Sequence, residues 1–152
     1  MQAIVIPIAA LAIAATALFI AMQRRLGRLQ PNIVWVQLTF SEASFRAIIE
    51  RWGPEGRERF RSHFPLDYCF LLCYGWLGFL LGRALQSAAS GQALCWVLPL
   101  AAACDALENL LHQRFLAAAP GSLPRQAFVL AGLASSAKWL LILAFPLLAF
   151  RA

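Results

Sequence analysis

The sequence predicts an all-α membrane protein: a four-helix transmembrane bundle with a cytoplasmic amphipathic interfacial segment between spans 1 and 2. Two observations predict this fold class. Of the 152 residues, 61% are hydrophobic and 13% are charged, which leaves too little polar surface to cover a water-soluble domain of this size. Four stretches are also apolar over the roughly 20 residues that a helix needs to cross a bilayer. We treat residues 1–152 as a single transmembrane domain.

Each predicted span is a long apolar run. The spans cover residues 3–22, 64–82, 93–111 and 127–150, and a long connection covers residues 23–63. No Lys or Arg precedes the first run, whereas Arg24, Arg25 and Arg28 follow it. A secretory signal peptide has the opposite arrangement and a shorter apolar core. We therefore interpret the first run as an uncleaved membrane-spanning helix.

The distribution of Arg residues predicts how the chain is oriented. Eight Arg fall in residues 23–63, and Arg114 and Arg125 flank the connection between the third and fourth spans. The other side has only Arg83 and Arg151. Because cytoplasmic loops carry the excess of Lys and Arg, we expect both termini outside and the long connection inside. The net charge of +6 thus reflects topology, and no nucleic-acid surface is expected.

The connection of residues 23–63 is expected to be amphipathic. Residues 32–40 are rich in β-branched and aromatic side chains, which favours an extended stretch at the interface. Ser41 is expected to cap a helix that ends at the WGPEG motif, and Pro54 to open a second short helix. This pair either lies flat on the cytoplasmic leaflet or packs as a lid on the bundle. His63 is expected among the headgroups.

The cysteines give no sign of a redox or metal site. All four fall within spans, and no pair has the CxxC spacing. Buried cysteines of this kind act as small hydrophobic residues. We predict no cofactor.

Charged residues inside three of the spans are the main functional signal. Asp105 and Glu108 lie in the third span, Lys138 in the fourth, and Asp67 just inside the cytoplasmic mouth of the second. A charge at mid-bilayer costs about 2.5–3.5 kcal/mol on insertion scales, so such residues normally face other helices and pair. We therefore expect these four residues to face the interior of the bundle.

The segment ACDALENLLH places its polar residues on one face of a helix. With Asp105 set at 0°, Glu108 falls at about −60° and Asn109 at about +40°. His112 falls between them, at about −20°. On the fourth span, Lys138 shares a face with small residues that suit close helix contact. These faces are expected to meet in the bundle interior.

Depth along the helices supports the same grouping. At about 1.5 Å per residue, Asp105 lies about 9 Å and Glu108 about 5 Å from the cytoplasmic end of their span, and Asp67 is level with Glu108. Lys138 lies about 16 Å deep, and its flexible stem can reach back toward Asp105. We expect an ion pair between Lys138 and Asp105. Tyr74 shares the face of Asp67.

These groups predict a polar site in the cytoplasmic half of the bundle. Our first interpretation is a pocket that binds a lipid or small amphiphile. The residues expected to bind this ligand are Asp67, Tyr74, Asn109, His112 and Lys138. One alternative is an intramembrane acid–base enzyme, an isomerase or hydrolase, in which Asp105 and Glu108 titrate apart and act as the catalytic pair. Another is a structural or accessory subunit, whose buried ion pair only fixes helix register.

A metal site is not predicted. Asp105, Glu108 and His112 share a face, but the ExxH spacing of di-iron bundles is absent. Membrane lipid and a small amphiphilic ligand are the expected partners. A homo-oligomer or a partner membrane protein stays open.

The motif FPLDYCFLLCYG, followed by DALEN, resembles a pattern in small uncharacterised bacterial membrane proteins with four predicted spans. The segment RWGPEGRERFRSHF is similar to the same group, so the resemblance covers residues 36–112. It carries no known activity, but it implies a bacterial inner-membrane setting. It also implies importance for Asp67, Asp105, Glu108 and Asn109. The architecture is similar to that of sterol-isomerase-like membrane domains with buried acids, which favours a lipid-like ligand.

Overall fold

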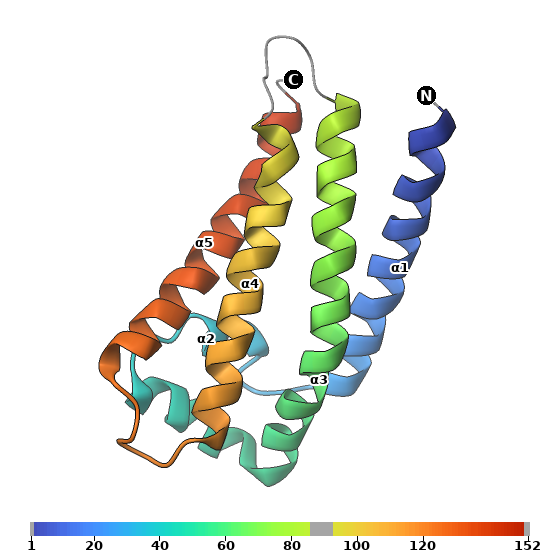
Figure 1. The fold of residues 1–152 in the computed structure, drawn as a ribbon. Helices are drawn as coiled ribbons and strands as arrows, with labels where there is room; N and C mark the ends of the chain where they lie inside the picture. The colour runs from blue at the N-terminus through green and yellow to red at the C-terminus, as the bar shows by residue number, and fades with distance from the viewer. Residues whose placement is uncertain (1, 86–92, 151–152) are drawn as a thin grey trace.

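The structure, a computed structural model, describes residues 2–85 and 93–150, and its regular elements within these ranges are all helices. The helices are α1 (Gln2–Leu26), α2 (Ile33–Gln37), α3 (Glu42–Leu85), α4 (Leu94–Ala117) and α5 (Arg125–Ala149). Four of them are long and apolar enough to span a membrane, while α2 has only five residues (Figure 1). The prediction of an all-α fold with four long apolar helices is confirmed.

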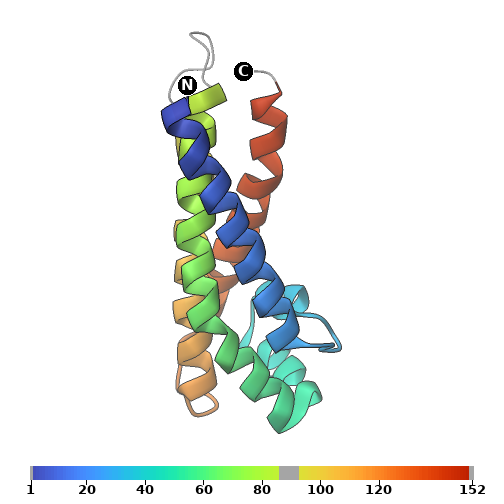
Figure 2. The same cartoon turned by 90° about the vertical axis from the view of Figure 1, so that its right-hand side faces the viewer.

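The four long helices pack in the order α1, α3, α4, α5 (Figure 1). Helix α3 lies between α1 and α4, and α4 lies between α3 and α5, whereas α3 and α5 touch at few points. Helix α1 begins, α3 ends, α4 begins and α5 ends at one end of the molecule. We call the opposite end, which carries the Arg-rich residues 24–61 and the connection between α4 and α5, the basic end. Seen from the side of α1, helix α1 crosses in front of α5 (Figure 2).

Glycines on α3 bring its backbone close to α4. A Cβ added at Gly82 would lie 2.6 Å from the Cα of Cys95, and one at Gly75 would lie 3.2 Å from the Cβ of Ala102. Small residues allow this close approach of two helices. At Gly82, the distance between α3 and α4 is therefore set by direct contact between their backbones.

Helix α3 consists of two arms joined at Gly53. Gly53 has φ 66° and ψ −173°, a conformation that is essentially restricted to glycine, and Pro54 follows it as the first residue of the second arm. The predicted break is thus confirmed. The predicted short second helix is wrong, because the second arm (residues 54–85) continues through Pro65 into the apolar span. Buried side chains on both sides of Pro65, such as Phe64 and Asp67, hold the helix across it.

The expectation of an extended stretch at residues 32–40 is also wrong. Asn32 Oδ1 accepts a hydrogen bond from the backbone N–H of Val34 at 3.2 Å and caps the short helix α2. The burial of Val36 then favours the helix over the β-propensity of its residues. After α2, Phe40 packs so close to α5 that a Cβ on Gly132 would lie 2.6 Å from its ring.

The first arm of α3 (residues 42–52) covers the basic end of α4 and α5 as a lid (Figure 1). Ser41 Oγ accepts a hydrogen bond from Ser44 N–H and caps the arm, as predicted. Beneath the arm, the Phe45 ring meets Phe115 edge-on with ring centroids 5.3 Å apart, and Phe115 stacks on Phe128 at 4.0 Å. Of the two arrangements expected from the sequence, this packing supports the one in which the segment packs as a lid on the bundle. It does not support the one in which the helices lie flat on the leaflet.

Polar contacts fasten the lid at its rim. Glu42 Oε1 accepts a hydrogen bond from the Gly121 N–H at 2.9 Å and pairs with Arg46 at 2.6 Å. The Gly121 hydrogen bond, together with Arg46, holds the pKa of Glu42 below its ordinary value. Arg46 and Arg57 donate to the carbonyls of Ala118 and Leu116, respectively, at the C-terminal end of α4. These cations satisfy carbonyls that lack a partner within the helix.

Replacing Gly82 with Ala should lower the free energy of unfolding by about 1–3 kcal/mol, because the methyl group would overlap the backbone of α4. Gly75→Ala is the matched control, since its methyl group would meet only a side-chain methyl at 3.2 Å. Thermal unfolding of the purified full chain in detergent measures both. Equal losses in the two variants would contradict the backbone contact at Gly82.

Candidate functional site

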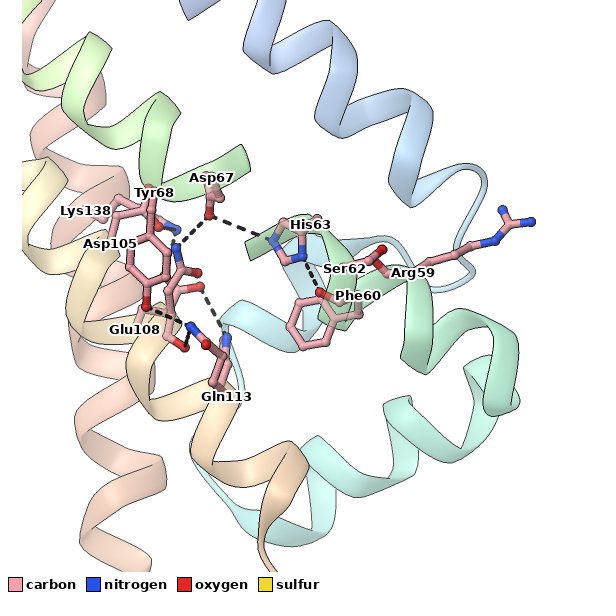
Figure 3. Close-up of polar contacts among 12 residues, drawn as sticks. Arg59, Phe60, Ser62, His63, Asp67, Tyr68, Asp105, Glu108, Gln113 and Lys138 are labelled. Carbon is pink, nitrogen blue, oxygen red and sulfur yellow. Dashed lines mark hydrogen bonds and ion pairs between the residues drawn. The ribbon is translucent and has the colours of Figure 1, made fainter. Parts of the chain in front are cut away.

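Lys138 on α5 pairs with two carboxylates on α4. Its Nζ lies 2.9 Å from Asp105 Oδ1 and 2.6 Å from Glu108 Oε2 (Figure 3). All three side chains are buried. The predicted pair of Lys138 with Asp105 is confirmed. Glu108 is a second partner of Lys138, because Asp105 and Glu108 are three residues apart and share the helix face toward α5.

The remaining oxygens of the two carboxylates face α3 and the basic end. Tyr74 O–H on α3 donates to Asp105 Oδ2 at 3.4 Å, a long hydrogen bond. On the other side, His112 Nδ1 lies 3.6 Å from Glu108 Oε1. One ammonium thus faces two carboxylates in a site that is almost fully buried within the protein. We call Asp105, Glu108 and Lys138 the ion cluster.

A second polar group lies beside the ion cluster, between α3 and α4. Asn109 Nδ2 donates to Asp67 Oδ2 at 2.7 Å, and His63 Nε2 lies 3.8 Å from the same oxygen (Figure 3). His63 Nδ1 contacts the carbonyl of Phe60. The expected position of His63 among headgroups is wrong, because it is only 2% exposed. The continuous second arm of α3 places it one turn before Asp67 on the same face.

Aromatic rings close these polar groups off from the basic end. The His112 ring stacks on Phe45 with centroids 5.5 Å apart and lies 5.8 Å from Phe60. The Phe60 ring also stacks on His63, at 5.1 Å. The lid and the start of the second arm therefore form an apolar floor under the polar side chains.

The residues predicted from the sequence come together, but in an enclosed site. Each has a side-chain contact within the protein, and the most exposed of them, Tyr74, is 8% exposed. The residues are Asp67, Tyr74, Asp105, Glu108, Asn109, His112 and Lys138. A ligand could touch them only if packed side chains moved. Within residues 2–85 and 93–150, no group of three His, Cys, Asp or Glu residues is arranged to hold a metal ion.

An apolar groove runs along the opposite side of the α3–α4 pair. It has a volume of about 560 Å³, and small residues form its base, among them Gly75 on α3 and Ala103 on α4. Phe79 lies edge-on to both Trp76 and Trp96, with centroids 5.9 and 5.5 Å away, at the end of the groove remote from the basic end. We call this the apolar groove.

A second hollow lies next to the apolar groove, on the side of the basic end. It has a volume of about 550 Å³, and Tyr68 lines both hollows. Its polar lining consists of Tyr68, Gln113 and Arg61, and its other lining residues are apolar. We call it the polar groove. The two grooves together are amphipathic, with the charge at the basic end.

A short chain of hydrogen bonds joins the polar groove to the buried site. Gln113 Nε2 donates to Tyr68 Oη at 2.8 Å and to the carbonyl of Asn109 at 3.3 Å (Figure 3). The Asn109 side chain in turn donates to Asp67. The two faces of the α3–α4 pair are therefore connected through Asn109.

The apolar groove was not predicted from the sequence, although the angular positions of residues on α4 indicate one of its two walls. With Asp105 at 0°, Ala103, Ala106 and Trp96 all fall between about 100° and 180° on α4. Within the predicted span of residues 93–111, this face combines small residues with tryptophan and contains no charge. Its partner face on α3 could be recognised only once the register of the two helices was known.

Comparison with protein-family models, curated proteins and solved structures gave no match. The geometry described above is therefore the basis for the function proposed below.

Replacing Lys138 with Met should destabilise the protein by about 3–5 kcal/mol, because two buried carboxylates would lose their cation. Adding Asp105→Asn and Glu108→Gln should recover most of this loss, because the ion cluster then carries no charge. Denaturant unfolding of the purified chain measures both variants, with Arg125→Met as the control for loss of an exposed cation. A triple variant as unstable as the single one would contradict the pairing.

Proposed function

We propose that this chain is a multi-pass protein of the bacterial inner membrane, with both termini outside and the basic end in the cytoplasm. Four long apolar helices and the gathering of Arg at one end support this orientation. Beside the basic end, α2 and the residues after it expose Trp35, Leu38 and Phe40. Such a cluster suits the interface, where tryptophan rings are favoured.

We further propose that the protein binds a lipid or small amphiphile in its cytoplasmic half, with the tail in the apolar groove. The observation that carries this proposal is that Tyr68 lines both the apolar groove and the polar groove, so the two lie next to each other. An amphiphile needs an apolar channel with a polar group at one end, at the depth where its headgroup lies. The two grooves provide this sequence from the hydrocarbon region toward the basic end.

The dimensions of the apolar groove suit a single acyl chain. From Tyr68 to Phe79 the helix rises about 16 Å, which is close to half of a hydrocarbon core of about 30 Å. The groove is therefore about as long as one leaflet is thick. The rings of Trp76, Phe79 and Trp96 close its inner end, where a chain from the cytoplasmic leaflet would stop.

The buried polar side chains are then best understood as supports of the groove. The ion cluster ties α4 to α5, and the bond between Asp67 and Asn109 ties α3 to α4, which forms the groove walls. This role corresponds to the structural alternative drawn from the sequence. The catalytic alternative, with Asp105 and Glu108 as acid and base, stays a prediction. The enclosure of both carboxylates weighs against it, because a substrate would have to displace packed side chains to reach them.

A Cys placed at Ser122, in the exposed connection between α4 and α5, should react with a membrane-impermeant maleimide only after the cytoplasmic side is opened. A Cys at Ala84, exposed at the other end of α3, should react in intact spheroplasts. The reverse labelling pattern would contradict the proposed orientation.

Replacing Ala103 with Phe should weaken lipid binding at least about tenfold, the effect of losing about 1.4 kcal/mol, because the ring would occupy the apolar groove. Native mass spectrometry of the purified chain, titrated with a lipid of defined composition, measures the bound fraction.

The matched control is Ala10→Phe, which adds the same ring to an exposed position on α1, away from the groove. It should leave the bound fraction unchanged. Equal binding by the wild type and the Ala103→Phe variant would remove the apolar groove as the tail site.

A further inference from the structure

We propose that the bound amphiphile is a lipid with an anionic headgroup, a phosphate or carboxylate, which Arg61 and the Tyr68 hydroxyl hold in the polar groove; this rests on the proposed function. The inference assigns the headgroup class, which the apolar groove alone leaves open. It follows from the unpaired guanidinium of Arg61 and the free hydrogen of the Tyr68 hydroxyl. It follows also from the absence of acidic residues in the lining of the polar groove, and from the position of this groove at the basic end of the apolar groove.

Arg61 is an exposed cation without an internal partner. Among the described residues it forms no hydrogen bond or ion pair, whereas its neighbours along the same arm are engaged. Arg57 donates to a carbonyl of α4, and Arg59 pairs with Glu55 at 2.6 Å. No acidic residue lines the polar groove. The guanidinium of Arg61 is thus available to an anion, and its fork geometry suits phosphate and carboxylate oxygens.

The Tyr68 hydroxyl is oriented to donate to the same anion. Its oxygen accepts a hydrogen bond from Gln113 Nε2 at 2.8 Å, and among the described residues no acceptor takes its own hydrogen. Gln113 is held in turn by the carbonyl of Asn109. A hydroxyl that already accepts one hydrogen bond, and whose hydrogen is free, is a prepared donor for an anionic oxygen.

Helical geometry places the two groups on the same side of α3. Arg61 and Tyr68 are seven residues apart, so they lie on the same face of α3, about 10 Å apart along its axis. Long side chains on a helix lean toward its N-terminus, so the two side chains tilt in the same direction and keep about this spacing. Both residues line the polar groove, and an anion between them would lie at the cytoplasmic end of the apolar groove.

The nearby C-terminal end of α4 does not cancel this attraction. A helix C-terminus carries a partial negative charge that would repel an anion. Here the carbonyls of Leu116 and Ala118 already accept hydrogen bonds from Arg57 and Arg46. These two cations offset the helix end, and Arg61 remains the unpaired positive charge in the lining of the groove.

The test compares lipids that have the same brominated acyl chains but different headgroups, phosphatidylglycerol against phosphatidylcholine. Each is titrated at low mole fraction into bilayers of unbrominated phosphatidylcholine that contain the full chain. Bromine on the tail quenches Trp76 and Trp96, which line the apolar groove. In the wild type, phosphatidylglycerol should bind about fivefold more tightly than phosphatidylcholine, as expected for one cation beside the membrane surface.

Arg61→Gln should reduce this preference to about one, and Arg61→Lys should retain most of it. Tyr68→Phe should lower it partly. The matched control is Arg125→Gln, which removes one exposed cation from the start of α5 and should leave the preference unchanged. Soluble glycerol phosphate should not displace the brominated lipid, because the tail supplies much of the binding.

The outcomes separate the two proposals. If Ala103→Phe lowers quenching by both lipids while Arg61→Gln leaves the preference intact, the tail site stands and the anionic headgroup site is wrong. Equal loss of preference in Arg61→Gln and Arg125→Gln would also overturn the inference, since only diffuse surface charge would then act. No effect of Ala103→Phe on either lipid would overturn the proposed function itself.

Discussion

Because a charge buried among apolar helices is costly unless it is paired, the Lys138 ammonium can lie only where Asp105 and Glu108 already converge. This requirement fixes both the register and the rotation of α5 against α4. The small residues on the same face of α5 then permit the close approach that short ion pairs need. With α5 fixed in this way, the lid packs on Phe128 at the start of α5 and on Phe115 near the end of α4.

The α3–α4 pair is the centre of the molecule and has two different faces. One face carries Asp67 and Asn109 and lies against the ion cluster; the other is the apolar groove. The same close contact, with Gly82 against the α4 backbone, serves both faces. Gln113 bridges them, since it holds Tyr68 in the groove and the Asn109 carbonyl beside the buried site. A buried polar interior and an accessible apolar groove thus share one pair of helices.

The long apolar helices, the break at Gly53 and the pairing of Lys138 with Asp105 could be predicted from the sequence, because composition, the glycine–proline step and helical periodicity each act locally. The buried position of His63 could not be predicted. It depends on whether the helix continues across Pro65, which is decided by side chains packing on both sides of the proline. The prediction of an extended stretch at residues 32–40 was wrong for a similar reason, since the burial of Val36 competes with the local β-propensity. The groove needs the relative register of two helices, which periodicity within one helix does not contain.

The second arm of α3 (residues 54–85) is one continuous helix of about 48 Å along its axis, longer than the hydrocarbon core of a bilayer, and it bends toward the basic end (Figure 2). Its part beside the basic end carries Phe60 of the apolar floor, and its remaining length forms one wall of the apolar groove. The two parts are therefore connected through one helix. A change in the tilt of α3 against α4 that widens the groove also shifts the floor of aromatic rings beneath the ion cluster. The mechanical link between the apolar groove and the basic end is then the helix itself, with the Gly53 break at its end.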